Sequence, residues 1–135
     1  MINLLAYYFA ITFGALVFSI VWAIYQRHII EAAITKDQYH ESRWHYWGGW
    51  VRCLVALIIS ILSYNTYQLI VVAITAGIMF LLVVWIVSDM VLNMILETKP
   101  GIFYRSKKHL FDRVPFSIRF FLLLMTWALI LWKSH

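Results

Sequence analysis

Charged residues are scarce in this sequence: Asp, Glu, Lys and Arg make up 13% of the 135 residues, whereas 64% are hydrophobic. An ordinary soluble domain carries about 25% charged residues. The shortage argues against a water-soluble globule and in favour of a membrane protein. A helix that crosses a bilayer needs about 20 apolar residues. The chain therefore has room for four such helices and two polar linkers, and we expect no separate soluble domain within it.

Cysteine and nucleophile motifs are also scarce. Cys53 is the only cysteine, which excludes an internal disulfide, a CxxC redox pair and a cysteine-rich metal site. The sequence contains neither a GxSxG elbow nor an SxxK pair. Nucleophilic catalysis is therefore poorly supported, and a non-enzymatic role is expected.

Two long stretches lack charge altogether. The first 25 residues have none, whereas a secretory signal peptide would begin with a basic region and end in a small-residue cleavage pattern. We therefore expect a retained first span. The second stretch, Cys53 to Ser88, is too long for one crossing. It must form a helical hairpin, for which the polar cluster 63–68 is the natural turn.

These features predict an all-α integral membrane four-helix bundle, built as one transmembrane domain of two helical hairpins. Polar linkers are expected over about 26–46 and 97–114, and apolar residues at helical spacing indicate that the first linker is partly helical and interfacial. Pro115 suits the first turn of the last helix. The expected helices cover about 4–25, 47–64, 68–96 and 115–132.

The basic residues predict the orientation. Apart from Lys133, every Lys and Arg lies in one of the two linkers or just beyond it, at Arg52 and Arg119. By the positive-inside rule, both linkers are cytoplasmic and both termini lie outside, in a bacterial inner membrane or an equivalent one. The net charge of +5 then meets anionic membrane lipids, and no nucleic-acid partner is expected.

A polar cluster is expected at the cytoplasmic boundary of the bundle. Asp89 and Asn93 are four residues apart and share one helix face. Because a charge in lipid is less costly when it is paired, an ion pair between Arg52 and Asp89 is expected. The alternative is that these side chains only lock the bundle or reach lipid headgroups. The cluster consists of Arg52, Asp89, Asn93, His45 and Arg119.

Two further candidate sites involve the linkers. A basic group in the second linker could hold lipid headgroups by charge and hydrogen bonding, although topology alone also places cations there. Its residues are Arg105, Lys107, Lys108 and Arg113.

A metal site could use nitrogen and oxygen ligands that zinc or iron accepts, although the histidine spacings match no tight ligand pair. Its residues would be His28, His40, His45 and Asp89. No other cofactor is indicated, and bound lipid is compatible with the sequence.

Two segments carry a resemblance to known sequences: HESRWHYWGGWVR and SDMVLNMILETKPGIFYRSKKHLFDRV. Together they resemble small, uncharacterised multi-spanning membrane proteins encoded by bacteria and phages, a group with no established activity. The resemblance covers about residues 40–114 and implies that the polar cluster matters. The matching residues are His40, Trp44, His45, Arg52, Asp89, Asn93, Tyr104, Asp112 and Arg113.

The sequence favours a small polytopic membrane protein that acts as a non-enzymatic accessory or self-associating subunit. Its expected partners are membrane lipids and either further copies of the chain or a larger membrane protein. Two alternatives stay open. A small oligomeric channel or holin-like pore would need a polar stripe through the bilayer, which the charge-free stretches disfavour. A lipid-headgroup-directed or metal-dependent membrane enzyme would use the histidines and Asp89.

Overall fold

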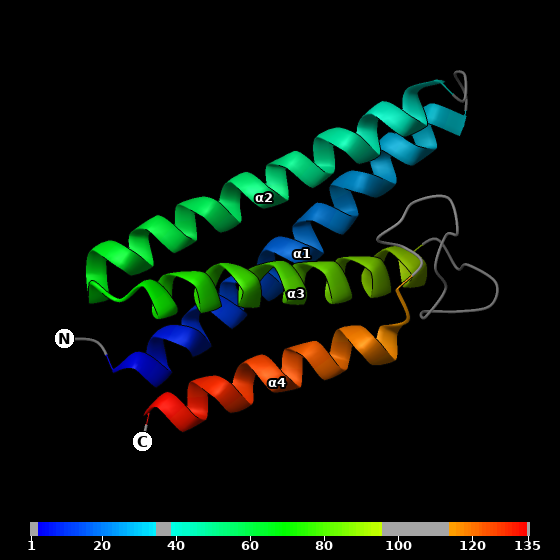
Figure 1. Cartoon of the computed structure of the whole chain (residues 1–135). Coiled ribbons are helices and arrows are strands. Elements are labelled where there is room, and N and C mark those ends of the chain that lie inside the picture. Colours follow the sequence, from blue (N-terminus) through cyan, green and yellow to red (C-terminus); the bar gives the residue numbers. More distant parts are fainter. Residues whose placement is uncertain (1–2, 35–38, 96–113, 135) are drawn as a thin grey trace.

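The computed structural model describes residues 3–34, 39–95 and 114–134, with side chains described within 3–27, 48–95 and 114–133. The described chain forms four helices and no strand, which confirms the expected all-α fold. The helices are α1 (Leu4–Ile34), α2 (Tyr39–Tyr67), α3 (Ile70–Ile95) and α4 (Phe116–Ser134). The start of α1, the α2–α3 turn and the end of α4 lie at one end of the molecule (Figure 1). We call this the terminal end and the opposite one the linker end.

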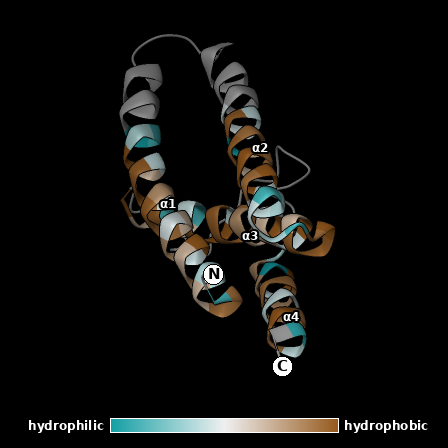
Figure 2. Ribbon diagram, turned by 90° about the vertical axis from the view of Figure 1, so that its left-hand side faces the viewer, coloured by the Kyte–Doolittle hydropathy of each residue, from teal (hydrophilic) through white to brown (hydrophobic). Residues whose placement is uncertain are grey.

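Each helix contains a segment that is long and apolar enough to cross a membrane (Figure 2). Their lengths, between 18 and 26 residues, match the thickness of a hydrocarbon core. We refer to these as the four apolar segments: Leu4–Arg27, Gly48–Tyr67, Ile70–Ile95 and Phe116–Lys133.

The first polar linker is shorter than expected. α1 continues to Ile34 and α2 begins at Tyr39, so helix covers much of the segment 26–46. Hydropathy falls after Arg27, but a helix ends only where its backbone bonding is interrupted. This segment contains neither proline nor glycine, the residues that most often end a helix.

The α2–α3 turn is also tighter than expected. The hydroxyls of Ser63 and Thr66 donate to carbonyls one turn back, at 2.6 and 2.8 Å. Residues 63–67 therefore belong to the last turns of α2 and not to a loop. Gln68 ends α2 with a left-handed φ of 54°, and its N–H donates to the Tyr64 carbonyl at 2.7 Å. This is the bond of an αL cap. Gln68 and Leu69 alone connect the two helices.

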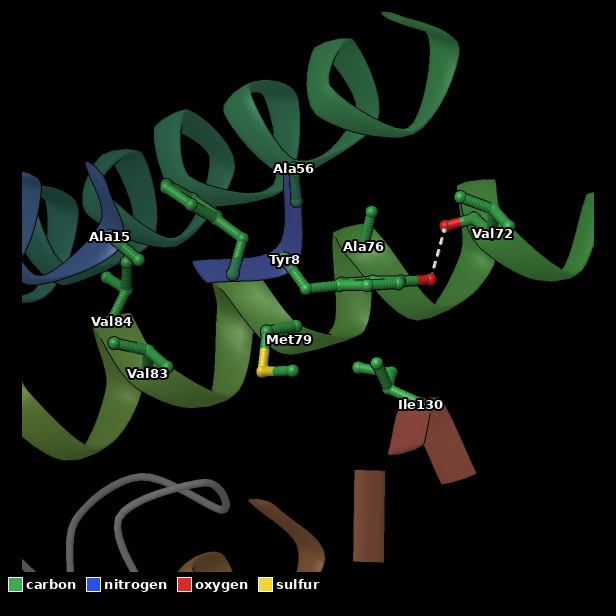
Figure 3. Packing of buried hydrophobic residues seen from close by; sticks show 10 residues of the cluster. Tyr8, Ala15, Ala56, Val72, Ala76, Met79, Val83, Val84 and Ile130 are labelled. Carbon is green, nitrogen blue, oxygen red and sulfur yellow. Dashed lines mark hydrogen bonds between the residues drawn. The ribbon is translucent and has the colours of Figure 1, made fainter. Parts of the chain in front are cut away.

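α3 is the central helix of the molecule. It packs against each of the other three helices, whereas α1 and α2 make few contacts with each other. Twelve of the 26 residues of α3 are buried, a larger share than in the apolar segment of any other helix. All four helices contribute to the core around α3 (Figure 3). Its buried members are Tyr8, Ala15, Ala56, Val72, Ala76, Met79, Phe80, Val83, Val84 and Ile130.

Small residues allow the helices to approach α3 closely. On α1, Ala15, Ser19 and Ala23 recur every fourth residue and are fully buried. On α3, Gly77 faces α2, where an added Cβ would lie 3.3 Å from the Ala56 carbonyl oxygen. Close packing of small residues is the usual basis of helix association in membranes. Ala73, one turn before Gly77 on α3, is also buried, so these two small residues lie within the helix packing of the chain.

Candidate functional site

The most distinctive polar site lies at the linker end, between α3 and α4. Pro115 precedes α4, and its carbonyl accepts the N–H groups of Ile118 and Arg119 at 3.1 and 3.2 Å. This start places Arg119 in the first turn with its side chain directed inward. Arg119 has no exposed surface, although guanidinium groups are among the most costly side chains to bury.

The surroundings of Arg119 compensate its charge. Nη1 lies 2.6 Å from Oδ2 of Asp89 on α3, and Nε donates to the Val114 carbonyl at 3.1 Å. The guanidinium carbon lies 4.3 Å from the centre of the Trp85 ring and 4.6 Å from that of Phe116. The ion pair with Asp89 and the cation–π contact with Trp85 therefore join α4 to α3. Val114 and Phe116 hold the guanidinium from its own end of α4.

The two partners of Arg119 on α3, Trp85 and Asp89, lie on one face of that helix. Trp85, Asp89 and Asn93 follow one another at intervals of four residues, and Asn93 is buried. The spacing of Asp89 and Asn93 is visible in the sequence, and Trp85 extends the same pattern by one turn. Sequence reasoning missed Trp85 because seven tryptophans suit membrane interfaces equally well.

The expected pair between Arg52 and Asp89 is wrong, because Asp89 pairs with Arg119. The Arg52 guanidinium lies instead 5.8 Å from the Trp22 ring centre on α1. With its amide oriented so that oxygen faces the donors, Gln26 accepts from Arg52 Nη2 at 3.0 Å and from Trp22 Nε1 at 2.8 Å. α2 rises away from α3 toward the linker end (Figure 1), which carries Arg52 to α1. We call Arg52, Gln26 and Trp22 the α1–α2 contact.

A third set of polar contacts lies at the terminal end. The hydroxyls of Tyr7 on α1 and Ser63 on α2 are 2.7 Å apart. The hydroxyls of Tyr8 and Thr75 also form a hydrogen bond, which joins α1 to α3. Sequence reasoning missed both, because tyrosines near the end of a span are typical of interfaces whether or not they bond inside the protein.

The other expected sites fall largely outside the described part of the chain. Arg105, Lys107, Lys108 and Arg113 lie there, and the side chains of His28, His40 and His45 are not described. The headgroup and metal hypotheses therefore stay predictions. Among the described residues, no three His, Cys, Asp or Glu side chains come together as metal ligands.

Comparisons of the chain with protein-family models, curated proteins and solved structures found no match. In the described part, the charged groups of Arg119 and Asp89 engage each other between two helices. A carboxylate bonded to a buried guanidinium is suited to holding those helices together, because any loss of its charge would leave the guanidinium without its counter-ion.

Proposed function

We propose that this protein is a non-enzymatic integral membrane subunit that associates with further copies of itself or with a larger membrane protein. The observation that carries the proposal is that polar side chains bond to one another within the chain. Each end of the helix arrangement is held by polar contacts within the chain, at Arg119 with Asp89 and at Tyr8 with Thr75. These groups stabilise the fold, and their bonding within the chain leaves the apolar surfaces facing outward.

The outward faces are suited to lipid and to other helices. α2 exposes a continuous apolar face toward the surroundings, and only Gly48, Ala56 and Ser63 of its apolar segment are buried within the chain. In a bilayer, helices associate through shape and close packing, since lipid tails are as apolar as leucine. The exposed large residues of this face are Leu54, Leu57, Ile58, Ile61 and Leu62.

The same surfaces disfavour the pore among the alternatives. A conduit needs polar groups along an exposed face for the full thickness of the membrane. Most of the exposed positions in the described part of the apolar segments carry aliphatic or aromatic side chains. The metal-dependent enzyme is tested directly by metal analysis of the purified protein. One equivalent of metal per chain would support that alternative.

Cys53 provides a test of association without any added label. It is exposed on α2, next to the apolar face. A short thiol-reactive cross-linker applied to native membranes is expected to give a product of twice the chain mass or a defined larger product with a partner. Cys53→Ser should abolish this product.

A second cysteine position extends the cross-linking test from the face of α2 to a face of α4. Leu124→Cys, made together with Cys53→Ser, places the thiol on the exposed side of α4, where residue 124 is 68% exposed. If neither cysteine gives a product, and gentle mass spectrometry of the released protein shows single chains without companions, association is refuted.

A further inference from the structure

A cavity lies at the terminal end, remote from the Arg119 site. Its volume is about 390 Å³, within the range of about 300–1,000 Å³ that is typical of ligand sites. It is bounded by the start of α1, the α2–α3 turn with the start of α3, and the last turns of α4. These segments lie together in Figure 1, where the chain termini mark the same end.

The walls of the cavity are predominantly apolar. Leu4 on α1, Val72 on α3 and Ile130 on α4 line three of its sides. Among the polar residues that line it, Tyr8, Thr75 and Gln68 form side-chain hydrogen bonds within the chain. The Tyr8 hydroxyl is bonded to Thr75 and lies 3.4 Å from the Val72 carbonyl oxygen, to which Figure 3 shows it pointing. Apolar walls with satisfied polar groups suit a hydrocarbon chain better than water.

The rim of the cavity carries a positive charge. Among the described lining residues, Lys133 is the only charged one, and it lies in the last turn of α4. The neighbouring Trp132 is 76% exposed, as expected for an aromatic residue at a membrane interface. A lysine here extends its ammonium group to the level of lipid headgroups.

We propose that this cavity binds an anionic phospholipid, with one acyl chain between α1, α3 and α4 and the phosphate beside Lys133. Anionic lipid is favoured over zwitterionic lipid because the described lining includes no carboxylate that could accept a choline or ethanolamine cation. The described lining of the site comes from the helix ends at the terminal end, and the proposal does not depend on the oligomeric state.

Photo-cross-linking tests the proposal on the full chain in vesicles. Phosphatidylglycerol with a diazirine in its acyl chain is the probe, and phosphatidylcholine with the same group is the matched control. Mass spectrometry of the labelled peptides should place phosphatidylglycerol on segments 64–75 and 129–133, with several-fold less phosphatidylcholine there. Lys133→Gln should lower the phosphatidylglycerol labelling about fivefold, the effect of one cation near a lipid surface.

Filling the cavity provides an independent arm. Leu129→Trp and Val71→Trp each add bulk to its lining and should reduce labelling there. Leu124→Trp adds the same bulk to an exposed position of α4 outside the cavity and should leave labelling unchanged. Circular dichroism establishes whether each variant is folded. If one of the two cavity variants fails to fold, the other provides the test. Equal labelling by both lipids, or labelling spread evenly over the exposed faces, would overturn the proposal.

Discussion

At the scale of single residues, burial of Arg119 makes its counter-ion important to stability. Removing one partner of a buried ion pair costs about 3–5 kcal/mol, because the other charge is left without compensation. Asp89→Ala should therefore lower the free energy of unfolding by about that amount. The double change Asp89→Leu with Arg119→Met removes both charges and should recover most of the loss. Unfolding in mixed detergent micelles measures both effects.

A double-mutant cycle distinguishes this pair from the one that the sequence suggested. The cycle of Asp89 with Arg119 should give a coupling energy of about 3 kcal/mol or more, because the loss from removing Asp89 mostly disappears when Arg119 is removed as well, and the cycle of Asp89 with Arg52 should give a value near zero. A large coupling between Asp89 and Arg52 together with none for Arg119 would contradict the pairing in the structure.

Two adjacent glycines should respond differently to the same substitution. An added Cβ at Gly48 would lie 3.2 Å from Cζ2 of Trp22, whereas one at Gly49 would meet nothing within 4 Å. Both positions are helical, so alanine gains up to about 1 kcal/mol in helix propensity at either. Gly49→Ala should therefore raise the unfolding free energy, and Gly48→Ala should lose this gain by pressing on the α1–α2 contact. Thermal unfolding of the two variants side by side gives the comparison, and identical shifts would refute it.

At the scale of the helix, the sequence could predict where the four apolar spans lie, but neither the full lengths of α1 and α2 nor which helices are neighbours. Apolar runs locate the four spans because a bilayer demands about 20 apolar residues for each. Counting along each helix also brings Asp89, Arg119 and Arg52 to one depth. The partner of Asp89 depends on where α2 lies relative to α3 at the level of Arg52. The two helices are in contact at Gly77, beside Ala56 and Ser60. Such contacts between helices leave no periodic trace near Arg52.

The contact between α2 and α3 predicts a strong effect of bulk at Gly77. Leucine there would force its side chain against Ser60 and the Ala56 carbonyl, and overpacking of this kind typically costs about 1–3 kcal/mol. Gly77→Leu should therefore lower the unfolding free energy by about this amount. Gly14→Leu on α1 is the control, because an added Cβ at Gly14 meets nothing within 4 Å. An equal loss for both variants would show that glycine matters for the helix backbone and not for the contact.

At the scale of the whole molecule, four antiparallel helices place both termini and the α2–α3 turn at one end (Figure 1). The positive-inside rule assigns the opposite, basic end to the cytoplasm. Single cysteines in a Cys53→Ser background test both steps. Asn3→Cys and Asn65→Cys should react with a membrane-impermeant maleimide in intact cells, and Arg27→Cys should react only after lysis. A reversed pattern would invert the orientation while preserving the fold. Labelling of Asn3→Cys and Asn65→Cys from opposite sides would contradict the arrangement itself. The helices α1 and α2 lie between these residues, and two crossings return the chain to the side on which it began.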